Sequence, residues 1–490
     1  MDEWQRARSL FQTLWGYDGF RGPQGDIIQT ILQGRDLWAL LPTGTGKSLC
    51  FQLPALLRSG LTVVVSPLVS LMDRQVADLR AKGLPAATLH SEVPRSQQKE
   101  VLDRLERGQL RLLYLSPETL FSQRVWSRLL RLAPQIQGLA IDEAHCLAQW
   151  GETFRPAYRR LGIARQTLEA AAQKPIPIAA FTATATPTDR AIIAQVLGLR
   201  NPAWFEQSPY RANLRLQVQR CWVPAQRQWR LRRWLRDRPG QGGLIFARSR
   251  QTCEDLARNL RDRGYQTAAY HAGLPPPDRR RLEAQWVGGK LPFLVCTSAF
   301  GMGIDRPDVR WIVHWHRPMI PAEYVQEIGR AGRDGQPADI LLLVSEPTGW
   351  LDSTDQRLDR HFQQQTRQQI QNLGLVARRL PQEGAIAEIA DQFAEGAIAL
   401  SWLHALGQLD WLDPFHYKLS GQLSGQWSGQ WSATIARQAR MGRSVELSMR
   451  RYGGDRGCRW RFLLQALGLP PKSANWRCGQ CDRCRHTGQR

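Results

Sequence analysis

A glycine-rich loop near the N-terminus is the first feature of the sequence that could carry chemistry. Residues 41–48 read Leu-Pro-Thr-Gly-Thr-Gly-Lys-Ser, follow a short apolar run and precede a stretch with helical apolar spacing. Glycines let backbone N–H groups approach phosphate oxygens, a lysine neutralises the outer phosphates, and a serine hydroxyl ligates Mg²⁺. We therefore predict a nucleoside-triphosphate site made by Thr43, Gly44, Thr45, Gly46, Lys47 and Ser48. The alternative is a chance glycine-rich turn.

Two adjacent carboxylates, Asp142 and Glu143, end another apolar run at residues 139–141. Such a pair is usually a solvated turn, but the upstream phosphate loop favours a catalytic interpretation. We predict that Asp142 helps to hold Mg²⁺ and that Glu143 polarises the attacking water.

Four of the nine cysteines gather near the C-terminus in the pattern Cys458-x₁₉-Cys478-x₂-Cys481-x₂-Cys484. Four thiolates at this spacing suit a tetrahedral structural Zn²⁺, and an iron–sulfur cluster is the alternative. The other five cysteines are scattered, which argues against a disulfide framework and for a reducing compartment.

Composition, length and charge indicate the general type of protein. The chain has 490 residues, is 42% hydrophobic and 22% charged, and carries a formal net charge of +23. Its length predicts two or three domains, and its charge predicts a polyanionic partner rather than solubility alone. There is no leader-like N-terminus and no apolar run near the roughly 18 residues of a spanning helix. We therefore expect a soluble, intracellular protein without a membrane partner.

Short apolar runs alternate with helical patterns, which indicates an α/β class with buried parallel strands. The first series lies at residues 36–41, 61–65, 112–115, 139–141 and 178–181. The second lies at 244–246, 293–296, 311–313 and 340–344. We predict two doubly wound domains in tandem, at residues 1–205 and 206–345, with ligands at the carboxyl ends of their strands.

The alternation stops beyond residue 345, so residues 346–490 are predicted to be a mainly helical C-terminal region. Two helical patterns and a hairpin around Asp413-Pro414 suggest a winged-helix-like insert at 380–419, with a helical spacer as the alternative. The repeats of Ser-Gly-Gln in residues 420–432 suggest a linker or hairpin tip. The cysteine pattern places a metal module at 449–490.

Three further motifs resemble those of a known family. Residues 181–185 read Phe-Thr-Ala-Thr-Ala, and residues 324–335 read Tyr-Val-Gln-Glu-Ile-Gly-Arg-Ala-Gly-Arg-Asp-Gly. Residues 15–24, Trp-Gly-Tyr-Asp-Gly-Phe-Arg-Gly-Pro-Gln, look like an adenine-recognition motif. Together with the phosphate loop, the sequence is similar to the RecQ family of superfamily two helicases. The resemblance implies two RecA-like domains.

The resemblance also assigns roles to individual residues. It implies that Tyr17 and Arg21 stack on adenine while the amide of Gln24 reads its edge, so the nucleotide should be ATP. It implies that Arg333, with Arg330 beside it, stabilises charge on the γ-phosphate. The cysteine pattern resembles the family's zinc module, which favours zinc over an iron–sulfur cluster.

Residues 146–156 resemble the aromatic-rich loop that couples DNA binding to hydrolysis in this family. Here Trp150 and Phe154 would stack on bases, and Arg155 would contact a phosphate or base. The family's usual His-Asp is replaced by Glu152-Thr153, which makes this coupling a property to be measured.

The resulting prediction is an ATP-dependent DNA helicase that uses ATP, Mg²⁺ and Zn²⁺. The resemblance implies 3′ to 5′ movement on single-stranded DNA and unwinding of duplex DNA in repair or recombination. We expect it in the cytoplasm, at the nucleoid if the source is bacterial; the sequence indicates no protein partner. The alternatives are an RNA-directed helicase and a nucleic-acid-binding scaffold whose ATPase has decayed.

Overall fold

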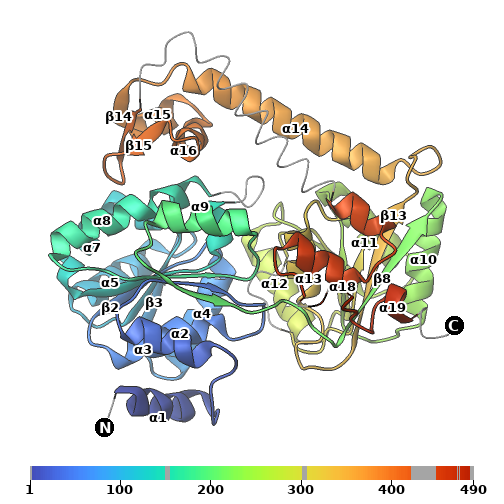
Figure 1. Cartoon of the computed structure of the whole chain (residues 1–490), viewed down its shortest axis with the longest axis horizontal. Helices are drawn as coiled ribbons and strands as arrows, with labels where there is room; N and C mark the ends of the chain where they lie inside the picture. Colours follow the sequence, from blue (N-terminus) through green and yellow to red (C-terminus); the bar gives the residue numbers. More distant parts are fainter. Residues whose placement is uncertain are drawn as a thin grey trace. The chain divides into compact units, whose positions relative to one another are not determined.

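The computed structural model describes residues 3–148, 155–300, 306–420 and 448–485, except 472 and 474. The chain divides into two compact units (Figure 1). Unit 1 comprises Met1–Leu41, Thr45–Gln207 and Thr366–Gln438. Unit 2 comprises Pro42–Gly44, Ser208–Gln365 and Ala439–Arg490.

Unit 1 is built on a seven-stranded sheet with the order β3-β4-β2-β5-β6-β1-β7. All of its strand pairs are parallel. The strands are β1 (Leu37–Leu40), β2 (Leu61–Val65), β3 (Ala86–Leu89), β4 (Leu112–Leu115), β5 (Ile136–Ile141), β6 (Ile178–Thr182) and β7 (Ala203–Glu206). The inner strands are continuous apolar runs because helices cover both faces of the sheet.

Helices flank this sheet on both sides (Figure 1). The helices of unit 1's first part are α1 (Glu3–Trp15), α2 (Gln24–Leu32), α3 (Lys47–Leu57), α4 (Val69–Ala81), α5 (Arg95–Glu106), α6 (Pro117–Leu120), α7 (Gln123–Arg131), α8 (Leu161–Ala172) and α9 (Pro187–Leu197). Apolar residues of α2, α3 and α4 pack on one face of the strands. Figure 1 shows α7, α8 and α9 on the other face.

Unit 2 is built on a six-stranded, all-parallel sheet with the order β10-β11-β9-β12-β13-β8. Its strands are β8 (Leu214–Cys221), β9 (Gly243–Phe246), β10 (Thr267–Tyr270), β11 (Phe293–Cys296), β12 (Trp311–His314) and β13 (Ala338–Ser345). Alternate strand residues enter two separate cores because successive side chains point to opposite faces. The predicted pair of parallel α/β domains is confirmed.

Helices also cover both faces of the second sheet. The helices α10 (Pro224–Arg236) and α11 (Arg250–Arg261) contribute to one core. The helices α12 (Pro276–Val287), α13 (Pro321–Ile328) and α18 (Arg459–Ala466) contribute to the other. The short helix α19 (Asp482–Arg485) lies against β8.

The helix α14 (Thr354–Ala377) starts in unit 2 and ends in unit 1. It has 24 residues but is polar and Gln-rich. Within the described residues, no helix combines the length and apolar character that crossing a membrane would require.

A small module of unit 1 follows α14. It contains β14 (Glu383–Ala385), α15 (Ile386–Gln392), α16 (Gly396–Ala405), β15 (Leu409–Trp411) and β16 (His416–Leu419). Its antiparallel sheet has the order β14-β16-β15, and the predicted hairpin is β15–β16. Arg160 donates to the carbonyl of Pro414 at 2.8 Å, and Ser401 donates to the carbonyl of Pro156 at 3.2 Å. These contacts attach the module to the rest of unit 1.

Candidate nucleotide site and cysteine cluster

The phosphate loop joins β1 to the N-terminus of α3, as the sequence predicts. Gly44 and Gly46 have φ angles of 82° and 76°, a left-handed conformation that favours glycine. A Cβ on Gly46 would also lie 2.7 Å from Nε2 of Gln24. Glycine at this position therefore allows both the backbone turn and close packing of the neighbouring amide.

Lys47, the first residue of α3, and Glu143, which follows β5, lie together in unit 1. Their Nζ and Oε1 atoms are 3.6 Å apart, and both side chains are largely buried. Lys47 Nζ forms no hydrogen bond within the part of the chain that the structure describes. The ammonium group thus retains donors for phosphate oxygens, which is what the predicted role requires.

Asp142 forms hydrogen bonds through its backbone and its side chain. Its N–H donates to the carbonyl of Val65 at 2.8 Å, and Ser66 Oγ lies 3.4 Å from its Oδ2. The hydroxyl of Tyr158 donates to its carbonyl at 3.1 Å. Burial, followed by the neighbouring charge of Glu143, raises the pKa of Asp142 to about 6, while Lys47 opposes this shift. Burial and the neighbouring charge both destabilise the ionised form of Asp142, so a cation bound beside this carboxylate would be favourable.

Glu143 adopts a left-handed φ of 48°, which is uncommon for a residue other than glycine. Its Oε2 lies 3.2 Å from Nδ1 of His145, and that nitrogen lies 3.1 Å from Oγ1 of Thr182. Strained residues of this kind concentrate at functional sites. The contacts also join the Asp-Glu-Ala-His sequence to the Phe-Thr-Ala-Thr-Ala sequence.

Ser48 is the other predicted Mg²⁺ ligand. Its Oγ accepts a hydrogen bond of 2.7 Å from Nε2 of Gln75, on α4. Gln75, Ser66, Tyr158 and Thr182 were not predicted as site residues. Thr182 belongs to the motif at residues 181–185, whereas the other three are ordinary polar residues whose relevance emerges only when the fold brings them beside Ser48 or Asp142.

The predicted adenine residues precede the phosphate loop. The guanidinium carbon of Arg21 lies 5.1 Å from the centre of the Tyr17 ring, and Tyr17 is half-exposed. Gln24 is buried: its Oε1 accepts from the Arg21 N–H at 2.8 Å, and its Nε2 donates to the Thr45 carbonyl at 2.8 Å. The amide therefore connects the start of α2 to the phosphate loop.

Arg330 and Arg333 belong to unit 2. The helix α13 ends at Ile328, and both arginines lie in turns beyond it. Gly332 has a φ of 56° and its N–H donates to the Val309 carbonyl at 2.8 Å, which stabilises the turn. Arg330 is nearly buried.

Of the predicted DNA-contacting residues, Arg155 is described, whereas Trp150, Glu152, Thr153 and Phe154 lie outside the described residues. The guanidinium of Arg155 contacts Oε1 of Glu118 and the carbonyl of Pro67, both at 3.2 Å.

The four C-terminal cysteines converge in unit 2. The Sγ atoms of Cys458, Cys478, Cys481 and Cys484 all lie within 4.8 Å of one another. The Cys478 and Cys484 sulfurs are 3.8 Å apart, the separation of roughly 3.8 Å that Zn–S bonds of about 2.3 Å give in a tetrahedron. The N–H of Cys478 also points to Cys458 Sγ at 3.3 Å. The donor set and its packing fit a structural metal ion.

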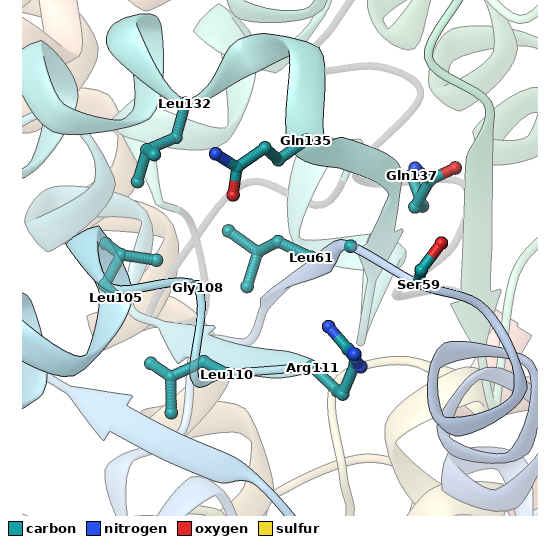
Figure 2. A pocket seen from close by; sticks show the side chains of 10 residues that line it. Ser59, Leu61, Leu105, Gly108, Leu110, Arg111, Leu132, Gln135 and Gln137 are labelled. Carbon is teal, nitrogen blue, oxygen red and sulfur yellow. The ribbon is translucent and has the colours of Figure 1, made fainter.

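A cavity of about 270 Å³ lies elsewhere in unit 1 (Figure 2). It opens beside the amino ends of β2 and β4, and its lining includes Leu61, Leu110, Arg111 and Gln135. The phosphate loop and Asp142 follow the carboxyl ends of β1 and β5. The cavity is therefore at the opposite edge of the parallel sheet from the candidate nucleotide site.

Comparison with known proteins identifies two helicase domains. Residues 21–192 match the DEAD/DEAH box helicase family, and residues 227–335 match the helicase conserved C-terminal domain. The chain is 45% identical over 484 residues to the ATP-dependent DNA helicase RecQ of Synechocystis sp., covering 99% of both proteins.

Other relatives match over part of their length. The chain is 39% identical over 347 residues to the ATP-dependent DNA helicase RecQ of Haemophilus influenzae, covering 70% of this chain and 54% of that protein. The Mycobacterium smegmatis helicase Lhr, solved with ssDNA and AMP-PNP, has a TM-score of 0.58 at 21% identity. That match covers 71% of this chain and 49% of Lhr, and it shows the shared fold.

Proposed function

Because this chain belongs to the RecQ family of DNA helicases, we propose that it is an ATP-dependent DNA helicase. The observation that carries the proposal is the buried group of Lys47, Asp142 and Glu143 beside the phosphate loop. A scaffold that had lost its ATPase would have no need to keep these charges together, since burying them is costly.

Each of these residues has a defined task in hydrolysis. Lys47 binds the β and γ phosphates through the donors that its ion pair with Glu143 leaves available. Glu143 orients the attacking water and receives its proton. When bound, Mg²⁺ neutralises phosphate charge, and Ser48 and Asp142 are the residues that would hold it.

Further residues complete the proposed set of nucleotide contacts. Tyr17 and Arg21 stack on adenine, and Gln24 positions the phosphate loop while its remaining N–H faces the base edge. Thr43, Gly44, Thr45 and Gly46 supply backbone N–H groups. Arg333, with Arg330 beside it, stabilises the charge that develops on the γ-phosphate.

The DNA-directed part of the proposal rests on family membership and charge. Trp150 and Phe154 stack on bases, and Arg155 contacts the strand once it leaves Glu118. The protein moves 3′ to 5′ on single-stranded DNA and unwinds duplexes during repair or recombination. The Synechocystis relative is bacterial, so the corresponding place of action is the cytoplasm, at the nucleoid.

We place the functional domains at residues 1–205, 206–345 and 346–490, with a winged-helix-like insert at 380–419 and a zinc module at 449–490. The zinc module would hold its ion through Cys458, Cys478, Cys481 and Cys484. Zinc is favoured over an iron–sulfur cluster by the sulfur separations and by the family.

The test is ATP hydrolysis by the full chain with no nucleic acid, with single-stranded DNA and with RNA. We expect strong stimulation by DNA and weak stimulation by RNA. Lys47→Ala should reduce the rate by at least about 100-fold, because it removes a positive charge from the developing phosphate charge. Lys99→Ala, an exposed lysine on α5, is the matched control.

Other results would redirect the proposal. Stronger stimulation by RNA would identify an RNA-directed helicase. No hydrolysis by the wild type would support the scaffold alternative. A rate of ATP hydrolysis that does not change when DNA is added would mean that the loop containing Glu152 and Thr153 does not transmit DNA binding to the ATPase site.

A further inference from the structure

Exposed apolar side chains concentrate at one corner of unit 2. Trp350 is 88% exposed, Trp222 is 50% exposed and Trp229 is 46% exposed. Val223 and Leu351, next to two of them, are also strongly exposed. We call Trp222, Trp229 and Trp350 the tryptophan corner. The nucleotide site and the cysteine cluster use none of these three residues.

Strand pairing brings Trp222 and the turn that carries Trp350 to the same end of the sheet. Cys221, the last residue of β8, pairs with Ser345, the last residue of β13. Trp222 therefore directly follows one strand, and the turn that carries Trp350 directly follows its neighbour. Trp229 lies in the second turn of α10, which begins two residues after Trp222 and packs beside β8 (Figure 1).

The buried side chain of Arg227, on α10, ties these segments together. Its guanidinium donates to Oγ of Ser345 at 2.9 Å. It also pairs with Asp352 at 3.4 Å and Asp355 at 3.5 Å, which flank the end of the Trp350 turn. This buried network thus ties α10, which carries Trp229, to the end of β13 and to the turn that carries Trp350.

The turn that presents Trp350 is braced internally. The buried carboxylate of Glu346 accepts the N–H of Thr348 at 2.7 Å and that of Leu351 at 3.1 Å. The N–H of Trp350 itself donates to Thr348 Oγ1 at 3.2 Å. The indole ring is therefore held out toward solvent on an ordered turn.

Arginines accompany the exposed rings. Trp229, Arg233 and Arg236 are spaced at i, i+4 and i+7, so they share one face of α10. Arg233 lies 5.6 Å from the Trp229 ring, and Arg220 is exposed just before Trp222. The exposed carboxylate of Asp237 offsets one of these charges, and Asp352 and Asp355 are engaged by Arg227.

We propose that the tryptophan corner binds single-stranded DNA. Planar apolar rings interleaved with arginines complement a chain of bases joined by phosphates, because bases stack on indoles while guanidinium groups neutralise the backbone. The corner also lies at the carboxyl ends of the sheet's strands, the edge at which ligands bind in such folds. The inference rests on the proposed function, since it takes DNA as the substrate.

The test compares the full-length wild type with Trp350→Ala and with the triple variant Trp222→Ala/Trp229→Ala/Trp350→Ala. Binding of a labelled oligothymidylate is measured by fluorescence anisotropy. Each lost stack should weaken binding by about 5-fold or more, and Trp350→Phe should retain most of the affinity. Photo-crosslinking to the wild type should label peptides that contain Trp222, Trp229 or Trp350.

Two matched controls separate a local effect from a general one. Trp204→Ala removes another exposed tryptophan, on β7 of unit 1, and Arg261→Gln removes an exposed arginine from α11 of unit 2. Neither variant should change binding as the triple variant does. DNA-independent ATP hydrolysis should be unchanged in Trp350→Ala, which shows that the variant is folded.

The inference and the proposed function fail in different ways. A wild type that does not hydrolyse ATP contradicts the proposed function. A wild type that is stimulated by DNA, together with a triple variant that binds oligothymidylate normally, overturns the tryptophan corner as a DNA site. That second outcome would assign the surface to an acidic protein partner.

Discussion

At the scale of single residues, a buried pair in unit 2 has strongly shifted pKa values. Nε2 of His314 lies 2.7 Å from Oε2 of Glu327. Burial lowers the pKa of His314 to about 3 and raises the pKa of Glu327 to about 8, although Arg330 and Arg248 oppose the second shift. Burial therefore favours a neutral carboxylic acid that donates to a neutral imidazole.

This pair predicts how unfolding depends on pH. Glu327 has a raised pKa, so its stabilisation is present below about 4.5 and is lost as pH rises through about 8. His314 has a lowered pKa, so its stabilisation is present above 6.5 and is lost as pH falls through about 3. Between pH 4.5 and 6.5, the opposite contributions of the two residues to the pH dependence of the unfolding free energy cancel. Between pH 6.5 and 8, only the contribution of Glu327 remains, and the free energy of unfolding falls by up to about 1.4 kcal/mol per pH unit.

Glu327→Gln should remove the decline above pH 6.5, because an amide can still donate to His314 but cannot ionise. The measurement is the thermal midpoint at several pH values, and Asp255→Asn, an exposed carboxylate on α11, is the control. Equal slopes for wild type and Glu327→Gln would show that Glu327 is already ionised in the folded protein.

Residue types and spacing were sufficient to place the centre of the candidate site. Lys47 and Glu143 are far apart in sequence, yet the phosphate-loop and strand-end patterns predicted one site for both, and they lie 3.6 Å apart. The supporting contacts from Gln75 and Ser66 could not be predicted in the same way. A single glutamine or serine carries no local pattern, and only tertiary packing decides which polar atom it meets.

At the scale of elements, the strands that sequence patterns missed share one property. The runs predicted as strands correspond to all the inner strands of both sheets. The strands β3, β7, β8 and β10 were not among them, and these are the four edge strands. An edge strand is covered less completely, so it needs no continuous apolar run; β8 instead alternates as Leu-Arg-Leu-Gln-Val-Gln.

At this scale, we predict the effect of removing the Gln24 hydrogen bonds that link α2 to the phosphate loop. Gln24→Ala deletes both of its hydrogen bonds, the one from the Arg21 N–H and the one to the Thr45 carbonyl. With roughly 1 kcal/mol per bond, the KM for ATP should rise by about 10-fold or more. Gln24→Glu should be no better, because a carboxylate cannot donate to the Thr45 carbonyl.

Comparing ATP with GTP distinguishes the two roles of Gln24. If the side chain only positions the loop, Gln24→Ala will affect both nucleotides equally. If it also reads adenine, as the family resemblance implies, the preference for ATP will decrease as well. Gln33→Ala, an exposed glutamine just beyond α2, should change neither KM.

At the scale of the whole molecule, composition anticipated the organisation well. Length and alternating patterns predicted two parallel-sheet domains, and a net charge of +23 predicted a polyanionic partner. Sequence did not anticipate that the module after α14 would pack with the first sheet's unit, while the cysteine cluster packs with the second. Contacts such as Arg160 with Pro414 join residues too distant in sequence for any local pattern to indicate them.

The cysteine cluster stabilises the C-terminal end of the chain against unit 2. Cys458, Cys478 and Cys481 belong to one of the two cores that flank the sheet. Between the cysteines, Asp482 accepts the N–H of Val218 on β8 at 3.1 Å and pairs with Arg459 at 2.9 Å. Disrupting the cluster would therefore release contacts to the sheet as well as the local loop.

We expect about one zinc ion per chain by elemental analysis, in line with four thiolate ligands. A strong chelator, or Cys478→Ser, should lower the thermal midpoint by several degrees, since metal binding contributes directly to folding. Cys221→Ser, another buried cysteine of unit 2 that lies outside the cluster, controls for loss of a buried thiol. It should keep its zinc and its sensitivity to the chelator.

The two metals can be told apart without any activity measurement. A purified protein that absorbs visible light and contains iron and sulfide would replace zinc with an iron–sulfur cluster. The protein could also contain neither metal and have a thermal midpoint that changes with neither the chelator nor added zinc. This result would show that burial and the Arg459–Asp482 ion pair are sufficient to stabilise this end of the chain. In that case Cys478→Ser and Cys221→Ser should have similar effects, because each would remove only a buried thiol.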